Sequence, residues 1–355
     1  MADTMTSPPA TPPNSKGRNL WYSFLRWFDS WAGLEYIKTD GPPKFDWIRS
    51  IPFIAVHLMC LGVFWVGWSW TAVGVAVAFY FIRMFAITGW YHRYFSHRTF
   101  KTSRVTQFAF AVLGGMCVQR GPLWWAGHHR HHHIASDTPD DVHSPRQRGF
   151  LWSHMGWFTS QTHFAPRFKA VSDLYKFPEL RFLDRFDVIV PVLTGFAMFG
   201  LGYVLEISAP HLGTNGPQML IWGFFISTVA LAHGTFTINS LSHVYGSQRY
   251  DTGDDSRNNF LLALITMGEG WHNNHHYYPA STRQGFYWWE IDLTYYCLKL
   301  LERLGLVWDI REVPDYVREG KPKRKTLKQE EGHSLLKHPV DISIPVQAAA
   351  ENSPA

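Results

Sequence analysis

The sequence predicts an all-α fold, an integral membrane protein with four transmembrane helices in two hairpins, capped by a cytoplasmic helical domain rich in histidine. Hydrophobic residues make up 46% of the chain and aromatic residues 16%, yet the mean hydropathy is only −0.15. This combination indicates a membrane protein with a large water-facing part. Four apolar runs are each close to the ~20 residues that a bilayer core requires. The histidines recur at short spacings beside these runs.

The apolar runs set the order of elements along the chain. Residues 1–18 are rich in Pro, Ser and Thr, so we expect a disordered tail. A membrane domain follows over residues 19–310, and residues 311–355, which are charged and poor in aromatics, form a second tail that we expect to be mobile. The connectors within each pair of runs are short, which predicts two hairpins. The predicted spans are residues 51–68, 71–90, 188–205 and 219–239.

Two further stretches do not qualify as spans. Residues 108–118 are apolar but cover only about half of a bilayer core, which favours an interfacial or buried helix. Residues 150–187 have mixed polarity, and Pro166 and Pro178 divide them into short pieces. We therefore expect both stretches in the water-facing domain.

Lysine and arginine predict the orientation in the membrane. Neither connector within a pair of spans contains any, whereas the N-terminal segment, residues 91–187 and the chain after His243 contain many. Positive residues favour the cytoplasmic side, so both termini and all histidine clusters are expected there. The net charge of +5 follows this topology. The basic residues do not form one patch with stacking aromatics, which argues against a nucleic-acid partner.

The histidines repeat one spacing. His129, His132 and His133 follow the pattern H-x-x-H-H, which places them on one helical face. The same pattern returns at residues 272–276. A third pair, His92 and His97, turns about 140° along an α-helix, so it needs a helix end or an unwound turn to converge on one metal.

This many imidazoles predicts two metal ions. Eight clustered histidines exceed what one first-row ion binds, but they suit two ions with positions open for a reactant. A structural zinc site would have about four closed ligands, usually with cysteine, and the H-E-x-x-H motif of zinc hydrolases is absent. Redox metal chemistry on a membrane-dissolved substrate fits better. His243 follows Asn239 by about one helical turn where the fourth run ends, although ordinary helix capping would explain these residues equally well.

Four histidine motifs together resemble those of a known family. They occupy residues 92–97, 129–133, 239–243 and 272–276. Their order, their spacing and their placement relative to the hairpins are similar to the histidine boxes of membrane fatty acyl desaturases of the stearoyl-CoA (delta-9) type. The resemblance extends from about Trp47 to Ile310.

The resemblance implies a ligand set and a substrate tunnel. Asn239 would hold one of two Fe²⁺ ions through a water molecule, and the polar residues at the bend of the acyl tunnel match Gln119, Trp125 and Thr235. Phe236 stands where the family usually has tryptophan. The histidines implied to bind the two irons are His92, His97, His129, His132, His133, His243, His272, His275 and His276.

The resemblance also implies the reaction. A desaturase of this type uses O2 and two external electrons to introduce a cis double bond into a saturated long-chain acyl group, here expected at delta-9 of an acyl-CoA. The electrons would come from a ferredoxin or from a b-type cytochrome with its reductase, because the chain has no flavin or nicotinamide fingerprint and no fused cytochrome domain.

One departure from the family concerns the acyl carrier. Animal members place Arg-Asp just before the second box, where they contact coenzyme A, and this chain has Gly127 and His128 there. Gln161 and Thr162 stand in place of a second basic pair. A desaturase acting on acyl groups of intact lipids is therefore an alternative, as is a membrane hydroxylase or alkane oxygenase. A metal transporter would place its ligands at the bilayer midplane rather than beside the spans.

Several polar residues near the boxes have two interpretations. Acidic side chains could accept hydrogen bonds from ligand imidazoles, or they could be solvated loop charges. The acidic candidates are Glu269, Asp137, Asp140 and Asp141. The remaining histidines of the water-facing region are expected to be surface residues, structural residues or supports behind the ligands rather than ligands themselves, and these are His128, His131, His143, His154 and His163. Arg83 and His233 lie within spans and are expected to face the bundle interior.

Overall fold

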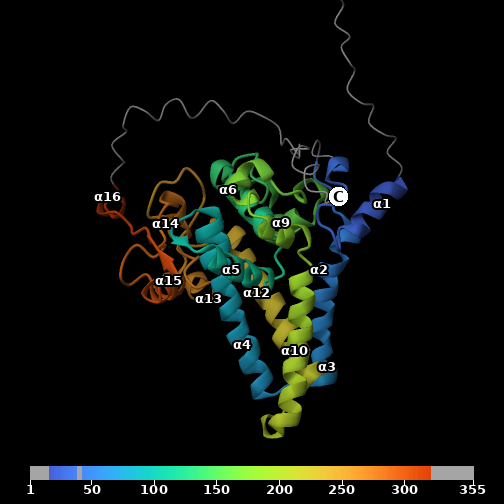
Figure 1. Cartoon of the computed structure of the whole chain (residues 1–355). Helices are drawn as coiled ribbons and strands as arrows, with labels where there is room; N and C mark the ends of the chain where they lie inside the picture. The colour runs from blue at the N-terminus through green and yellow to red at the C-terminus, as the bar shows by residue number, and fades with distance from the viewer. Residues whose placement is uncertain (1–15, 38–41, 321–355) are drawn as a thin grey trace, which may run out of the picture.

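A computed structural model describes residues 16–37 and 42–320, and shows long helices extending from one side of a body of shorter helices (Figure 1). Four helical segments are long and apolar enough to cross a membrane, and each overlaps one predicted span. The prediction of four such helices is confirmed. The segments are Trp47–Val66, Trp70–Ser96, Ile189–Ser208 and Gly216–His243.

The first two segments follow each other closely. The first consists of α2 (Trp47–Met59), η2 (Cys60–Gly62) and α3 (Val63–Val66), and the second of α4 (Trp70–Phe85) and η3 (Ala86–Ser96). Asp46 caps α2 by accepting a hydrogen bond from the Arg49 amide, and Ser69 caps α4 in the same way. Gly67 has a φ of 64°, which permits the sharp turn between them.

The other two segments pack against the first pair. The third is α10 (Ile189–Ser208), and η8 (Pro210–Leu212) leads to the fourth, which contains α11 (Gly216–Met219), η9 (Leu220–Ile226), α12 (Ser227–Asn239) and η10 (Leu241–His243). Both α2 and α10 pack on η9, and α4 packs on α12. Arg83 of α4 is fully buried and donates hydrogen bonds to Ser227 and Thr228. It faces the bundle interior, as predicted.

The segment η3 is a π-helix of eleven residues, and it explains how His92 and His97 can face the same point although they are five residues apart. The His97 amide donates to the His92 carbonyl oxygen at 3.2 Å, which is an i to i+5 hydrogen bond. In a π-helix, residues five apart therefore stack on one face, whereas in an α-helix they diverge. The wide turn at the end of the second segment brings this pair together.

The body of shorter helices packs around η3. Its main helices are α5 (Arg104–Gly115), α6 (Pro122–Ala135), α9 (Pro178–Arg185), α13 (Phe260–Ile265), α14 (His272–Tyr277) and α15 (Leu293–Arg303). Trp90 of η3 is fully buried and stacks on Phe110 of α5 with 3.9 Å between ring centroids. Gly114 of α5 lies so close to Tyr91 that a Cβ there would be 2.0 Å from the ring. These contacts hold η3 rigidly in the core.

A buried carboxylate positions α6, the helix with the second histidine motif. Asp184 of α9 is fully buried and accepts hydrogen bonds from the amides of Leu123 and Trp124, at 2.8 and 2.7 Å. These amides belong to the first turn of α6, where backbone donors lack helical partners and the helix dipole favours a negative charge. Trp31 donates to the other oxygen. Asp184 therefore links α6, α9 and the N-terminal segment.

The remaining elements are short. Residues 150–187 form several brief helical pieces, as predicted from their prolines. The predicted tails at 1–15 and 321–355 lie outside the described residues, but residues 311–320 belong to the folded body, where Val313 and Val317 are buried. The short elements are α1 (Lys16–Leu25), η1 (Leu34–Tyr36), β1 (Lys101–Thr102), α7 (Pro145–Arg148), η4 (Trp152–Gly156), η5 (Trp157–Thr159), η6 (Gln161–His163), η7 (Phe168–Val171), α8 (Ser172–Tyr175), β2 (Val307–Trp308), which pairs with β1, and α16 (Asp315–Arg318).

Candidate metal centre

The structure gathers the predicted histidines into two adjacent groups. Within each group, the candidate ligand atoms all lie within 4.8 Å of one another. Group one contains His92, His97, His129, His133 and His275. Group two contains His132, His243, His272 and His276. Three distant parts of the chain, η3, α6 and α14, contribute to group one, and η10 replaces η3 in group two.

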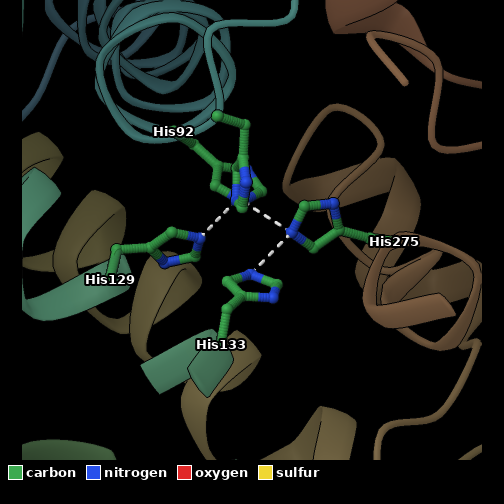
Figure 2. Close-up of side chains that lie close together, drawn as sticks. His92, His129, His133 and His275 are labelled. Carbon is green, nitrogen blue, oxygen red and sulfur yellow. Dashed lines mark hydrogen bonds between the residues drawn. The ribbon is translucent and has the colours of Figure 1, made fainter. Parts of the chain in front are cut away.

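The Nε2 atoms point toward the centre of each group. Figure 2 shows four rings of group one converging from different helices. The distances between Nε2 atoms are 3.0 Å for His92 and His275, 2.8 Å for His97 and His129, 2.9 Å for His275 and His133, and 3.1 Å for His243 and His272 of group two. The Nε2 atom of His276 is buried without a hydrogen-bond partner among the described residues.

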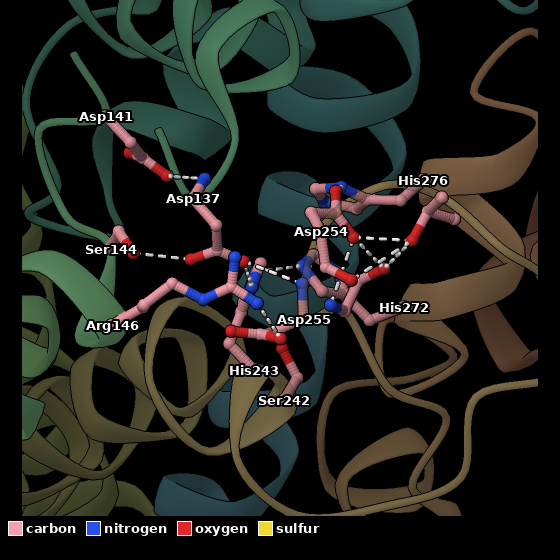
Figure 3. A network of polar contacts seen from close by, with 12 residues as sticks. Asp137, Asp141, Ser144, Arg146, Ser242, His243, Asp254, Asp255, His272 and His276 are labelled. Atoms are coloured by element: carbon pink, nitrogen blue, oxygen red, sulfur yellow. Dashed lines mark hydrogen bonds and ion pairs between the residues drawn. The ribbon is translucent and has the colours of Figure 1, made fainter. Parts of the chain in front are cut away.

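Buried carboxylates hold the rings of group two from behind (Figure 3). His243 donates from Nδ1 to Asp137 at 2.8 Å, and His132 donates from Nδ1 to Asp141 at 3.1 Å. His276 is 2.6 Å from an oxygen of a residue that the sequence argument did not single out, Asp254. A carboxylate at Nδ1 fixes the tautomer, so that the Nε2 lone pair faces the group centre.

In group one, a single carboxylate has this role. Glu269 contacts Nδ1 of His92, and it also pairs with the buried Arg93 at 3.0 Å. Gln284, another residue without a sequence signal, contacts both His92 and Glu269. Three of the four acidic candidates thus contact ligand-type imidazoles through their side chains. Asp140 does not, because only its backbone oxygen is bonded, to His131.

Burial keeps most of these imidazoles neutral. It lowers the pKa of five of them well below the ordinary histidine value, and neighbouring imidazoles lower the pKa further. The five are His97, His129, His133, His272 and His275. Burial also lowers the pKa of His132, but the Asp141 carboxylate outweighs it, so the net pKa of His132 is raised. Neutral imidazoles have the lone pairs that a cation needs.

The geometry fits two six-coordinate metal ions. Two nitrogen lone pairs that face each other at about 3 Å repel unless a cation lies between them. With a metal–nitrogen bond of about 2.1 Å, neighbouring ligands at 90° are about 3.0 Å apart, whereas tetrahedral ligands are about 3.4 Å apart. The observed 2.8–3.1 Å matches the 90° arrangement. Five and four histidines leave positions free on six-coordinate ions, whereas a structural zinc site is closed by about four ligands.

The five histidines that were not expected to be ligands lie outside the two groups. His128 and His131 contact backbone oxygens, and His154 contacts Ser240. His143 lies beside Asp141, with 3.7 Å between Nδ1 and the carboxylate, and burial lowers its pKa to about 3. His163 is partly buried, and its backbone oxygen accepts from Trp124. Their expected structural role agrees with these contacts.

A large cavity reaches group one at His129. It has a volume of about 740 Å³ and is lined mainly by apolar side chains of α2, α10, η9 and α12, together with His129 and Asn239. The three predicted tunnel residues all line it. Gln119 donates to Thr235 at 3.0 Å, and Trp125 stacks on His129 with 5.0 Å between ring centroids. A small void of about 40 Å³ shares several of these residues and continues toward α4.

Comparison with known proteins identifies the family. The family model described as fatty acid desaturase matches residues 68–309, more than half of the chain. The chain belongs to the fatty acid desaturase family. The matched range includes all nine clustered histidines and the residues that line the inner part of the cavity.

Several desaturases with curated names are similar over most of their length. An sn-1 stearoyl-lipid 9-desaturase from Anabaena variabilis is 36% identical over 280 residues, which cover 78% of this chain and 97% of that protein. An acyl-CoA 5-desaturase from Anemone leveillei is 36% identical, with 82% and 90% covered. The delta-9 acyl-lipid desaturase 1 of Arabidopsis thaliana is 35% identical, with 76% and 84% covered. The resemblance seen in the histidine motifs is confirmed, and the chain is an oxidoreductase.

Proposed function

We propose that this desaturase introduces a cis double bond at delta-9 of a saturated long-chain acyl group, using two irons held by the nine clustered histidines. The observation that carries the proposal is the convergence of five and four Nε2 lone pairs beside a long apolar cavity. Relatives named for position 9 support the position. The relatives are named for acyl-lipid or for acyl-CoA substrates, so they leave the acyl carrier open.

The chemistry requires a strong oxidant and precise placement. Methylene hydrogens are not acidic, so acid–base catalysis cannot remove them. Two bound irons, together with O2, would supply the oxidising power. In the balanced reaction the acyl chain loses two hydrogens, and O2 with two electrons and two protons becomes two waters. The electrons would come from an external ferredoxin or b-type cytochrome with its reductase.

The chain's own residues would supply selectivity. All methylenes of an acyl chain have similar reactivity, so one carbon–carbon bond must be held beside the metals. Gln119 and Thr235 join two walls of the cavity close to His129, and Asn239 lies at the same place. We propose that these residues fix the bend of the acyl chain and that Asn239 holds a water on one iron. The apolar lining keeps bulk water from the oxidant.

We propose a membrane arrangement that follows the sequence. The four long helices would form two hairpins across the bilayer, with the body of shorter helices, both termini and the metal centre on the cytoplasmic side. The distribution of lysine and arginine supports this orientation. The arrangement would place the histidine groups at the cytoplasmic ends of the second and fourth segments, which end at Ser96 and His243.

Complementation of a host that makes no monounsaturated fatty acids tests the proposal. Expression should restore a cis-9 olefin, detected by gas chromatography with mass spectrometry, and His129→Ala or His272→Ala should abolish it and lower the bound iron. His131→Ala is the matched control on the same helix as His129, because His131 lies outside both groups, and it should keep activity. A product that gains one oxygen would instead indicate a hydroxylase. Full activity in folded His129→Ala protein would contradict the ligand assignment.

A further inference from the structure

The large cavity opens sideways between two of the membrane-crossing segments. α2 and α10 each pack on η9, and the cavity runs along the space between them. Several of its α10 residues are also surface residues of the molecule, with 71% of Phe196, 48% of Val192 and 41% of Phe199 exposed. Both helices are long and apolar enough to span a bilayer. The open side of the cavity therefore faces the lipid hydrocarbon rather than water.

Three arginines that are buried or half-buried line the same cavity, and we call them the arginine rim. They are Arg26, Arg49 and Arg120. Their guanidinium carbons lie 5.4, 3.0 and 4.1 Å from the centre of the Phe164 ring. Like charges gathered this closely repel unless anions balance them.

Two donors of the rim have no hydrogen-bond partner among the described residues. Arg120 pairs with Asp187 at 2.8 Å, and Arg26 donates to two backbone oxygens. No carboxylate of the described residues pairs with the Arg49 side chain. Asp46, which caps α2, lies in its neighbourhood and partly offsets the charge. Arg49 Nε and Arg120 Nη1 are buried without a hydrogen-bond partner among the described residues. The rim thus keeps two donors without a partner, although Asp46 and Glu35 lie near Arg26, and Asp184 and Asp187 lie near Arg120.

The rim lies near the ends of two membrane-crossing segments. Arg49 is the third residue of the segment Trp47–Val66, and Asp187 lies two residues before the segment that begins at Ile189. The ends of membrane spans meet the headgroup region of the bilayer. Arginine recognises phosphate oxygens through paired donors. An anion of the bilayer surface is the ligand that fits both the position and the chemistry.

The sideways opening distinguishes between the two acyl carriers. An acyl thioester has one chain and needs only an opening toward water. A diacyl phospholipid must keep its second chain in the bilayer while the first enters the enzyme, so its cavity has to be open along the membrane. Resting on the proposed desaturation, we infer that the cavity takes one acyl chain of an intact phospholipid sideways from the bilayer, with the phosphate held by the arginine rim.

Purified full-length enzyme loaded with iron, in liposomes with a ferredoxin and its reductase, tests this inference. One arm contains phosphatidylglycerol with a deuterated stearoyl chain, and the other contains deuterated stearoyl-CoA in liposomes of unlabelled lipid. Intact-lipid mass spectrometry follows the loss of two deuterium atoms. We expect product in the phospholipid arm without added coenzyme A, and little in the thioester arm.

Two variants examine the rim and the opening. Arg49→Gln removes the unpaired charge and should lower the rate at limiting phospholipid roughly tenfold, since a hydrogen bond to a charged group is lost. Lys176→Gln removes an exposed charge that does not line the cavity and should have no effect. Val192→Trp fills the sideways opening and should impair phospholipid use while iron content stays normal.

The outcomes separate this inference from the proposed function. Product from stearoyl-CoA alone, unaffected by Val192→Trp, would overturn the inference while desaturation stands. Phospholipid product with equal rates for Arg49→Gln and wild type would overturn the role of the rim. No olefin in either arm from iron-loaded, folded enzyme would contradict the proposed function itself. As a readout independent of activity, native mass spectrometry should find phospholipid retained on wild type and lost from Arg49→Gln.

Discussion

The Asp254→Asn substitution examines how a hydrogen bond behind a ligand controls metal binding. One oxygen of Asp254 accepts from Thr252 and from both the hydroxyl and the amide of Ser256, and the other accepts from Nδ1 of His276. Asparagine has the same shape but one acceptor oxygen. Three donors favour that oxygen on the Thr252 and Ser256 side, so the amide NH2 would face His276. Nδ1 of His276 would then have to accept a hydrogen bond, so the ring hydrogen would sit on Nε2 and point into group two.

We expect the variant to bind metal 10- to 100-fold more weakly, the usual cost of losing such a support, which corresponds to about 1.4–2.7 kcal/mol. The assay is iron retained per protein, measured by mass spectrometry during titration with a chelator. The matched control is Asp255→Asn, since Asp255 pairs with the half-exposed Arg146 and its side chain does not contact the histidines. Equal iron retention in the two folded variants would refute the reasoning.

Three further changes test the cavity, α6 and the core. Thr235→Val removes the hydrogen bond that Gln119 donates to Thr235, so the double bond should form at more than one position of the acyl chain. Mass spectrometry should detect the additional positional isomers, and a single unchanged isomer would contradict this role. Burial raises the pKa of Asp184 to about 6, so between about pH 4 and 6 the folded protein holds a proton that the unfolded chain has released. As the pH rises through this window, the free energy of unfolding of the wild type should fall by up to about 3 kcal/mol. Thermal unfolding should show this fall in the wild type but not in Asp184→Asn. Gly114→Ala should lower the free energy of unfolding by roughly 1–3 kcal/mol because its Cβ meets a fully buried ring, whereas Gly74→Ala, with open space around it, should not; equal melting temperatures would count against this packing argument.

Local patterns account for what the sequence predicted well. Hydropathy alone identifies apolar runs that are long enough to cross a bilayer, so all four long helices were expected. The H-x-x-H-H spacing on α6 and α14 places three rings on one face by helical geometry, and the structure gathers them as expected. The pair His92 and His97 required a departure from the α-helix, and the π-helix supplies it. In each case the information lies within a few residues.

Long-range contacts explain what the sequence did not reveal. Asp254 lies 22 residues before His276, in a segment of ordinary loop composition. Gln284 contacts His92 across 192 residues. Nothing local distinguishes these residues from solvated polar side chains, because their role depends on which segments the fold brings together. The tail expected from residue 311 was also misjudged, since Val313 and Val317 are buried by contacts with Tyr250 and its neighbours.

The two histidine groups differ in the charge that surrounds them. Behind group two stand three buried carboxylates, Asp137, Asp141 and Asp254, whose pKa values are held below the ordinary range by their histidine partners although burial alone would raise them. Behind group one stands Glu269, which shares its charge with Arg93. A cation in group two is therefore stabilised by more negative charge than one in group one, although group one has the additional imidazole. Ligands should therefore exchange more readily on an ion in group one than on an ion in group two. His129, a member of group one, also lines the large cavity. The charge distribution would therefore favour tighter binding of a metal ion in group two, with the more exchangeable ion in group one, next to the large cavity.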